Sequence, residues 1–158
     1  MQQAFEQHHQ IGFLAARALL AQGLGWIMAW GYLQAAMAVC ALTASADGEV
    51  GLEERYAIDA AIAHDPLLEC FAPAQAVAVL DDQLFRLRAE PAETRETLLG
   101  IVEKAGRRPE RAVALMRLVW NVIAADDRVR PAELAEFETL CDLLEIDVET
   151  LRAPMLGL

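Results

Sequence analysis

AAMAVCALTASADGEVGLEE (residues 35–54) and ALMRLVWNVIAADDRVRPAE (residues 114–133) are two stretches of this chain that follow the same pattern. Each begins with an apolar segment of helical spacing and ends in the unit A-D-x-x-V-x-x-x-E. At an offset of 79 residues, six of the 20 aligned positions are identical. Because the shared unit lies where one helix ends and the next begins, we expect two similar helical hairpins and an internal two-fold pseudo-repeat.

The rest of the chain is also typical of helices. It has 158 residues, of which 56% are hydrophobic but only 6% aromatic, so alanine and leucine supply most of the packing. Apolar positions recur at helical spacing, and no alternating stretch indicates a strand. We predict an all-α, compact bundle of about seven helices, made of an N-terminal helical extension (1–32) and a main helical domain (33–158). Glycines and prolines place these helices at about 3–22, 26–46, 51–64, 73–89, 91–106, 109–125 and 131–144, followed by a short turn near 147–151.

The net charge narrows the classes of partner, and the cysteines indicate the cellular compartment. The formal net charge is −11, which disfavours nucleic acid because an acidic surface repels phosphate, and the cluster Arg107, Arg108 and Arg111 is typical of a solvated helix start. Cys40, Cys70 and Cys141 form no close pair and lie in apolar segments predicted to be helical. We therefore expect three buried thiols in a reducing compartment, the cytoplasm.

One long segment, residues 18–46, has no charged side chain and is long enough to span a bilayer. Its glutamines, glycines and many alanines give it modest hydrophobicity, and a central helix surrounded by other helices has the same composition. Trp26 and Trp30 fit either a membrane interface or a packed core. Membrane association is thus an alternative that the sequence does not favour.

The first acidic junction resembles the second half of a calcium-binding EF-hand loop. Asp47, Gly48, Val50 and Glu54 fall at the fifth, sixth, eighth and twelfth places of such a loop. The first and third places lie on the incoming helix, which excludes a complete EF-hand. We hypothesise instead that the two junctions face each other and share a divalent cation, calcium or magnesium. The proposed metal ligands are Asp47, Glu54, Asp126 and Glu133.

The same carboxylates have a purely structural interpretation. Glu54 and Glu133 fall in the first turn of a helix, where a carboxylate stabilises the helix dipole and closes a capping box. The second junction is also less suited to a cation, because Asp127 replaces Gly48 and Arg128 brings a positive charge. The sequence leaves capping and cation binding both open.

Residues 33–55, LQAAMAVCALTASADGEVGLEER, and 118–144, LVWNVIAADDRVRPAELAEFETLCDLL, resemble the two signatures of the TerB family. The resemblance covers about residues 33–151. It implies a bundle of about seven helices, in the bacterial cytoplasm or loosely at the inner membrane, that acts in tellurite resistance and metal-stress response as an interaction module with protein partners. It also implies metal binding by the repeated acidic residues, which here are Asp47, Glu54, Asp126 and Glu133. A homodimer is a further candidate assembly.

We expect no catalytic activity and no catalytic or cofactor-binding residues. His8 and His9 are adjacent and diverge on a helix, and none of the three histidines lies near an acidic junction in the sequence. The alternatives are a metal-dependent hydrolase that uses the shared carboxylates, and a membrane-anchored adaptor that uses residues 18–46.

Overall fold

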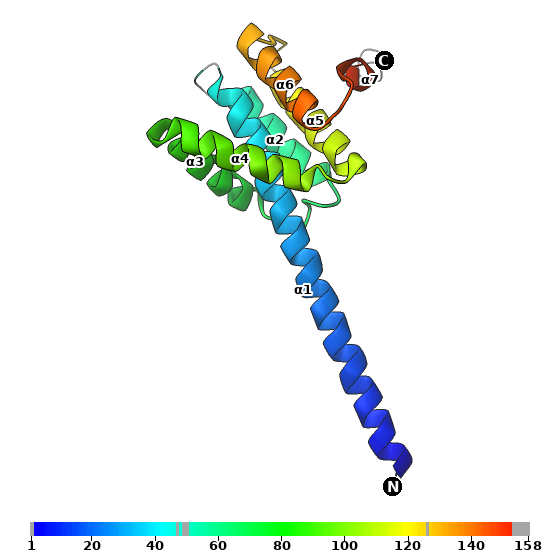
Figure 1. Cartoon of the computed structure of the whole chain (residues 1–158). Coiled ribbons are helices and arrows are strands. Elements are labelled where there is room, and N and C mark those ends of the chain that lie inside the picture. Colours follow the sequence, from blue (N-terminus) through cyan, green and yellow to red (C-terminus); the bar gives the residue numbers. More distant parts are fainter. Residues whose placement is uncertain (1, 47, 49–50, 126, 153–158) are drawn as a thin grey trace.

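The chain folds into a helical head with one long helix projecting from it (Figure 1). The structure, a computed structural model, describes residues 2–46, 48, 51–125 and 127–152, with side chains from residue 22 onward except at positions 150 and 152. The described residues contain no strand, which confirms the all-α class. The elements are α1 (Gln2–Ser45), α2 (Leu52–His64), α3 (Pro73–Ala89), α4 (Pro91–Ala105), α5 (Pro109–Ile123), α6 (Pro131–Leu143) and the five-residue α7 (Val148–Arg152).

Prolines fix the starts of four helices. Pro73, Pro91, Pro109 and Pro131 each occupy the first turn of α3, α4, α5 and α6. Proline suits this position because its φ is already helical and the amide hydrogen it lacks would have no partner within the helix. These starts agree with the boundaries predicted from the sequence.

The predicted break near Gly23 or Gly25 is wrong, because residues 2–45 form the single helix α1. The described part of the chain therefore has six longer helices and a five-residue α7 in place of about seven helices. A glycine inside a helix costs only about 1 kcal/mol relative to alanine, and neither glycine adopts a positive φ. The α1 helix also continues through residues 32 and 33, where the sequence suggested a boundary between extension and domain.

The second half of α1 is the central element of the head. Residues 32–44 are buried apart from Gln34, which is half-buried, and they pack against α3, α4, α5 and α6. At the N-terminal end of this segment, the Tyr32 hydroxyl donates a 3.0 Å hydrogen bond to Oδ2 of Asp65. Burial raises the pKa of Tyr32, and the negative charge of Asp65 raises it further. The uncharged segment 32–44 is thus a core helix, one of the two interpretations that the sequence allowed.

The first part of α1 projects from the head, and its last residues, among them Ala29 and Trp30, pack against the edge of the core. We call residues 2–31 the stem; Figure 1 shows it extending away from the other helices. By length and composition, one segment of the described chain, residues 22–45, could cross a membrane, and 67% of its most apolar window is buried in the head. Residues 22–31 of that segment belong to the stem.

Candidate functional site

The first acidic junction connects α1 to α2. Gly48 has a φ of +109°, in the region that favours glycine, and its N–H donates to the carbonyl of Ala44 at 3.1 Å. This turn lets the chain leave α1 and enter α2 within a few residues. Because α1 ends at Ser45, Thr43 and Ser45 are on the incoming helix, as the sequence indicated, and a complete EF-hand is excluded. Asp47 lies outside the described residues.

The second junction, between α5 and α6, also contains a left-handed residue, although the N–H of Asp127 donates to Ala124, three residues back, and the N–H of Gly48 reaches four residues back. Asp127, which aligns with Gly48, also has a positive φ of +57°. The N–H of Ala125 donates to the carbonyl of Val122 at 3.2 Å, and the aligned N–H of Ala46 donates to Thr43 at the same distance. Aspartate tolerates this left-handed conformation better than most residues other than glycine do. Asp126 lies outside the described residues.

The two glutamates occupy equivalent buried positions. Glu54 is 4% exposed and Glu133 is 0% exposed, and each is in the first turn of its helix. Oε2 of Glu54 accepts a hydrogen bond from the N–H of Gly51, and Oε2 of Glu133 accepts one from the N–H of Arg130 at 2.9 Å. The capping role that the sequence suggested for both carboxylates is therefore present, since each satisfies a backbone donor that the helix leaves unpaired.

The residue before each helix distinguishes the two junctions. In the second junction this residue is Arg130, whose Nη1 lies 3.4 Å from Oε1 of Glu133. In the first junction the aligned residue is Gly51, which has no side chain. A side chain at position 51 would begin 3.4 Å from Oε2 of Glu54 and 3.7 Å from Oε2 of Glu53. The first junction thus places two carboxylates beside position 51, whereas the second junction places the positively charged guanidinium of Arg130 beside Glu133.

Both junctions lie at the same end of the head, opposite to the stem (Figure 1). Within the described residues, no group of three or more acidic, histidine or cysteine side chains is placed to hold a metal ion. Two of the four predicted ligands, Asp47 and Asp126, are outside these residues. Sharing of one cation by Asp47, Glu54, Asp126 and Glu133 accordingly stays a prediction.

The core beneath the first junction contains a thiol. Burial raises the pKa of the fully buried Cys40 to about 12, and the nearby negative charge of Glu54 raises it in the same direction. Cys141 is buried too, but Cys70 is exposed in the turn between α2 and α3. The expectation that all three thiols are buried is wrong for Cys70, because Pro66 ends helical structure before that residue.

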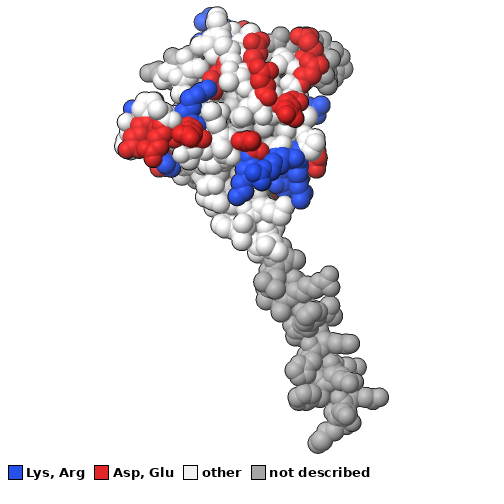
Figure 2. Space-filling model, in the orientation of Figure 1, with Lys and Arg blue, Asp and Glu red and all other residues white. Residues whose placement is uncertain are grey.

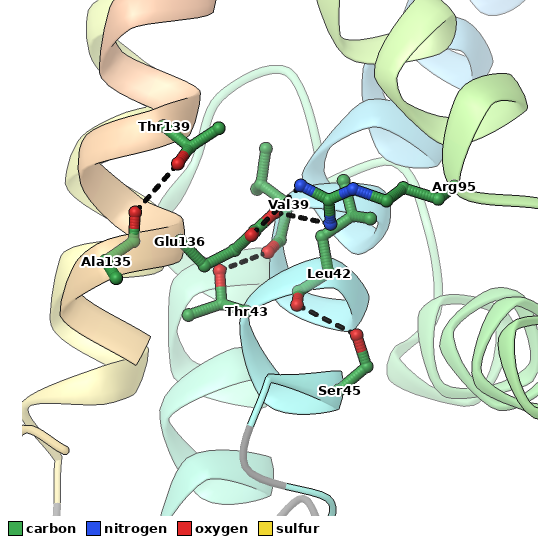
Figure 3. A network of polar contacts seen from close by, with 8 residues as sticks. All are labelled: Val39, Leu42, Thr43, Ser45, Arg95, Ala135, Glu136 and Thr139. Carbon is green, nitrogen blue, oxygen red and sulfur yellow. Dashed lines mark hydrogen bonds and ion pairs between the residues drawn. The ribbon is translucent and has the colours of Figure 1, made fainter. Parts of the chain in front are cut away.

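An ion pair ties α4 to α6 beside the end of α1 (Figure 3). Nη1 of Arg95 lies 2.9 Å from Oε1 of Glu136, and Nη2 donates to Oε2 at 3.0 Å. The hydroxyls of Thr43 and Ser45 donate back to carbonyls of α1 at 2.6 and 2.9 Å. The sequence gave no signal for this pair, because its two residues are 41 positions apart and lie in no shared motif.

The only histidine with a described side chain, His64, lies at the far end of α2. Its Nδ1 is 2.6 Å from the carbonyl oxygen of Ala60, as expected for a histidine at a helix end. Ten residues separate it from Glu54 in the same helix, which corresponds to about 15 Å. The histidine is therefore remote from the first acidic junction.

Comparison with known proteins assigns the chain to a family. Residues 33–155, more than three quarters of the chain, match the family described as Tellurite resistance protein TerB. Neither the curated proteins nor the solved structures contain a significant match. The matched region includes both acidic junctions and all the helices of the head. The chain belongs to the TerB family.

Proposed function

We propose that this protein is a non-enzymatic interaction module of a bacterial tellurite-resistance or metal-stress response. It acts in the cytoplasm through protein partners, and it binds a divalent cation, calcium or magnesium, at its acidic junctions. Family membership supports the biological context. A net charge of −11 suits both a cation and a basic protein surface as ligands.

The observation that carries the cation proposal is the difference between Gly51 and Arg130. Oxygens of two carboxylates, Oε2 of Glu54 and Oε2 of Glu53, lie within 3.7 Å of the place where a side chain at position 51 would begin, whereas the guanidinium of Arg130 occupies the aligned position of the second junction. Clustered carboxylate oxygens are the ligands that calcium and magnesium prefer. The neighbouring sequence adds Asp47, another oxygen ligand of the kind that calcium and magnesium prefer. We assign the stronger cation affinity to the first junction.

The two junctions also support the proposed pseudo-repeat. Gly48 and Asp127 share a positive φ, and Glu54 and Glu133 close the same capping contact 79 residues apart. Two hairpins that arose by duplication account for both similarities. In this proposal Arg130 weakens the cation affinity of the second copy, so the first junction contributes more to binding.

The place of His64 and the lining of the pocket support a role without catalysis. A metal-dependent hydrolase needs an open coordination position and usually a general base nearby. His64 is engaged with its own helix about 15 Å along α2 from Glu54. A pocket of about 530 Å³ is formed by α4, α5 and the C-terminal segment, and neither Glu54 nor Glu133 lines it.

Calorimetric titration with calcium, magnesium, manganese and zinc tests the proposal. We expect the unmodified protein to bind calcium or magnesium, and the double variant Asp47→Asn/Glu54→Gln to lose this binding. The matched variant Asp126→Asn/Glu133→Gln removes the same groups from the second junction and should retain most of the affinity. Circular dichroism establishes that both variants fold. No binding by the unmodified protein, or equal binding by the first variant, contradicts the proposal.

A further inference from the structure

The exposed apolar surface of the stem has a composition unusual for a helix in water. Leu24, Trp26, Ile27 and Met28 are between 42% and 62% exposed. Successive residues of an α-helix are about 100° apart, so these four side chains point to several sides of the stem. A partner helix would cover one side only, whereas a lipid phase covers all of them.

The sequence extends this apolar character toward the N-terminus. Residues 11–21, IGFLAARALLA, are helical and contain one charged residue, Arg17. Together with residues 22–28, which precede the part of α1 that packs on the core, they form 18 helical residues, a length of about 27 Å, close to the thickness of the hydrocarbon core of a bilayer. The half of α1 that fills the head is not needed for this length, so insertion of the stem leaves the fold of the head intact.

Aromatic side chains of the stem and the head meet where the stem leaves the head. Trp26 and Trp30 stack with ring centroids 5.8 Å apart, and both contact Phe71 of the head, at 6.5 and 5.9 Å. Trp26 is 54% exposed. Tryptophan favours the boundary between lipid and water, because its ring is apolar and its N–H is polar.

Basic side chains gather at the same place. A pocket beside the stem is lined by Ile27 and Met28 of α1 together with Lys104 and Arg111 of α4 and α5. Figure 2 shows Lys and Arg atoms clustered on the head close to the stem. Residues 103–111 contain four basic and two acidic side chains, a local charge of +2 in a chain of net charge −11. We call Lys104, Arg107, Arg108 and Arg111 the basic collar.

We propose that the stem inserts into an anionic phospholipid membrane and that the basic collar contacts the lipid head groups. The protein is acidic as a whole, but its local net charge is positive where the apolar helix leaves the head. A positive surface at this place attracts anionic lipid head groups. The acidic junctions at the opposite end of the head then face away from the membrane (Figure 1). The proposal is independent of cation binding.

Flotation of the purified full chain with vesicles tests this. After detergent removal, the protein is mixed with phosphatidylglycerol-containing or pure phosphatidylcholine vesicles and centrifuged through a density gradient. We expect stronger flotation with the anionic vesicles. Lys104→Gln/Arg111→Gln should weaken this binding roughly 25-fold, about fivefold per basic charge. Arg88→Gln/Arg128→Gln removes the same charge from the end of α3 and from the second acidic junction, at the end of the head opposite to the stem, and should have no comparable effect.

The stem itself is tested with Leu24→Asp/Ile27→Asp, which should abolish flotation with either lipid. Leu52→Asp/Tyr56→Asp places the same charges on exposed apolar positions of α2 and serves as the control. In a chain with Trp30→Phe/Trp120→Phe, the emission of Trp26 should move to shorter wavelength when vesicles are added.

Three results overturn the proposal. The folded protein could remain at the bottom of the gradient with both lipids. It could bind both lipids equally, without any effect of the collar variant. Lastly, sedimentation could show a discrete dimer that does not bind vesicles, in which case the stem pairs with a second copy of the chain.

Discussion

Arg130 contacts the carboxylate of Glu133 in two ways: its N–H donates to Oε2 at 2.9 Å, and its Nη1 lies 3.4 Å from Oε1. The guanidinium is half exposed, but the carboxylate is buried. The second junction thus contains the positive charge that neutralises its own buried acid. The aligned residue of the first junction, Gly51, cannot supply one.

This difference predicts that Gly51→Arg abolishes divalent-cation binding. The φ of −67° and ψ of 167° at Gly51 suit any residue, so the backbone accepts the change. An arginine there would compensate the carboxylates in place of the ion. Gly100→Arg adds the same charge at an exposed position of α4 with open space around it. Calorimetry should show cation binding for Gly100→Arg only; unchanged binding by Gly51→Arg would place the cation elsewhere.

Removal of the buried carboxylate of Glu133 should destabilise the head. Glu133→Ala leaves the N–H of Arg130 without its acceptor and opens space in the core. The expected loss is about 1–3 kcal/mol in the free energy of unfolding. Urea denaturation measures it. Glu96→Ala, at an exposed position of α4, should change this free energy by less than about 0.5 kcal/mol. Equal stability of the two variants would remove the capping role from Glu133.

The Arg95–Glu136 pair should couple α4 to α6. The Glu136 side chain is only 12% exposed, so Arg95→Met leaves a largely buried carboxylate without its partner. We expect a loss of about 1–3 kcal/mol for Arg95→Met. In the double variant with Glu136→Gln, the loss should be smaller than the sum of the two single losses. Additive losses in urea denaturation would show that the pair contributes nothing beyond its separate side chains.

The thiols should differ in reactivity. In the native protein, iodoacetamide at pH 8 should label exposed Cys70 and spare buried Cys40 and Cys141. Mass spectrometry of peptides identifies the labelled sites, and labelling in urea, where all three should react, is the control. Rapid native labelling of Cys40 would contradict its burial.

The pKa of Cys40 also predicts a loss of stability in alkali. Its value rises from an ordinary 9.0 to about 12 on folding, so above pH 9 the unfolded chain releases a proton that the folded protein retains. This stabilising contribution is complete below pH 9 and is lost between pH 9 and 12. In Cys40→Ala the decline of the unfolding free energy over this range should be less steep than in the unmodified protein. Identical slopes would exclude Cys40 as its source.

The sequence by itself determined the helical class and most helix boundaries, because proline and helical periodicity act locally. Pro73, Pro91, Pro109 and Pro131 marked helix starts without any knowledge of packing. The repeated unit likewise identified Glu54 and Glu133 as equivalent, and its alignment already contained the exchange of Gly51 for Arg130. Capping contacts join residues three positions apart, so short-range sequence is enough to predict them.

Only the tertiary structure decided which part of α1 is buried and which is exposed. The uncharged segment is compatible with a core helix and with a membrane helix, and the packing of α3–α6 around residues 32–44 divides it between the head and the stem. The same packing brings Arg95 to Glu136 and the basic collar to the base of the stem. Such contacts depend on how helices cross, which no local pattern encodes.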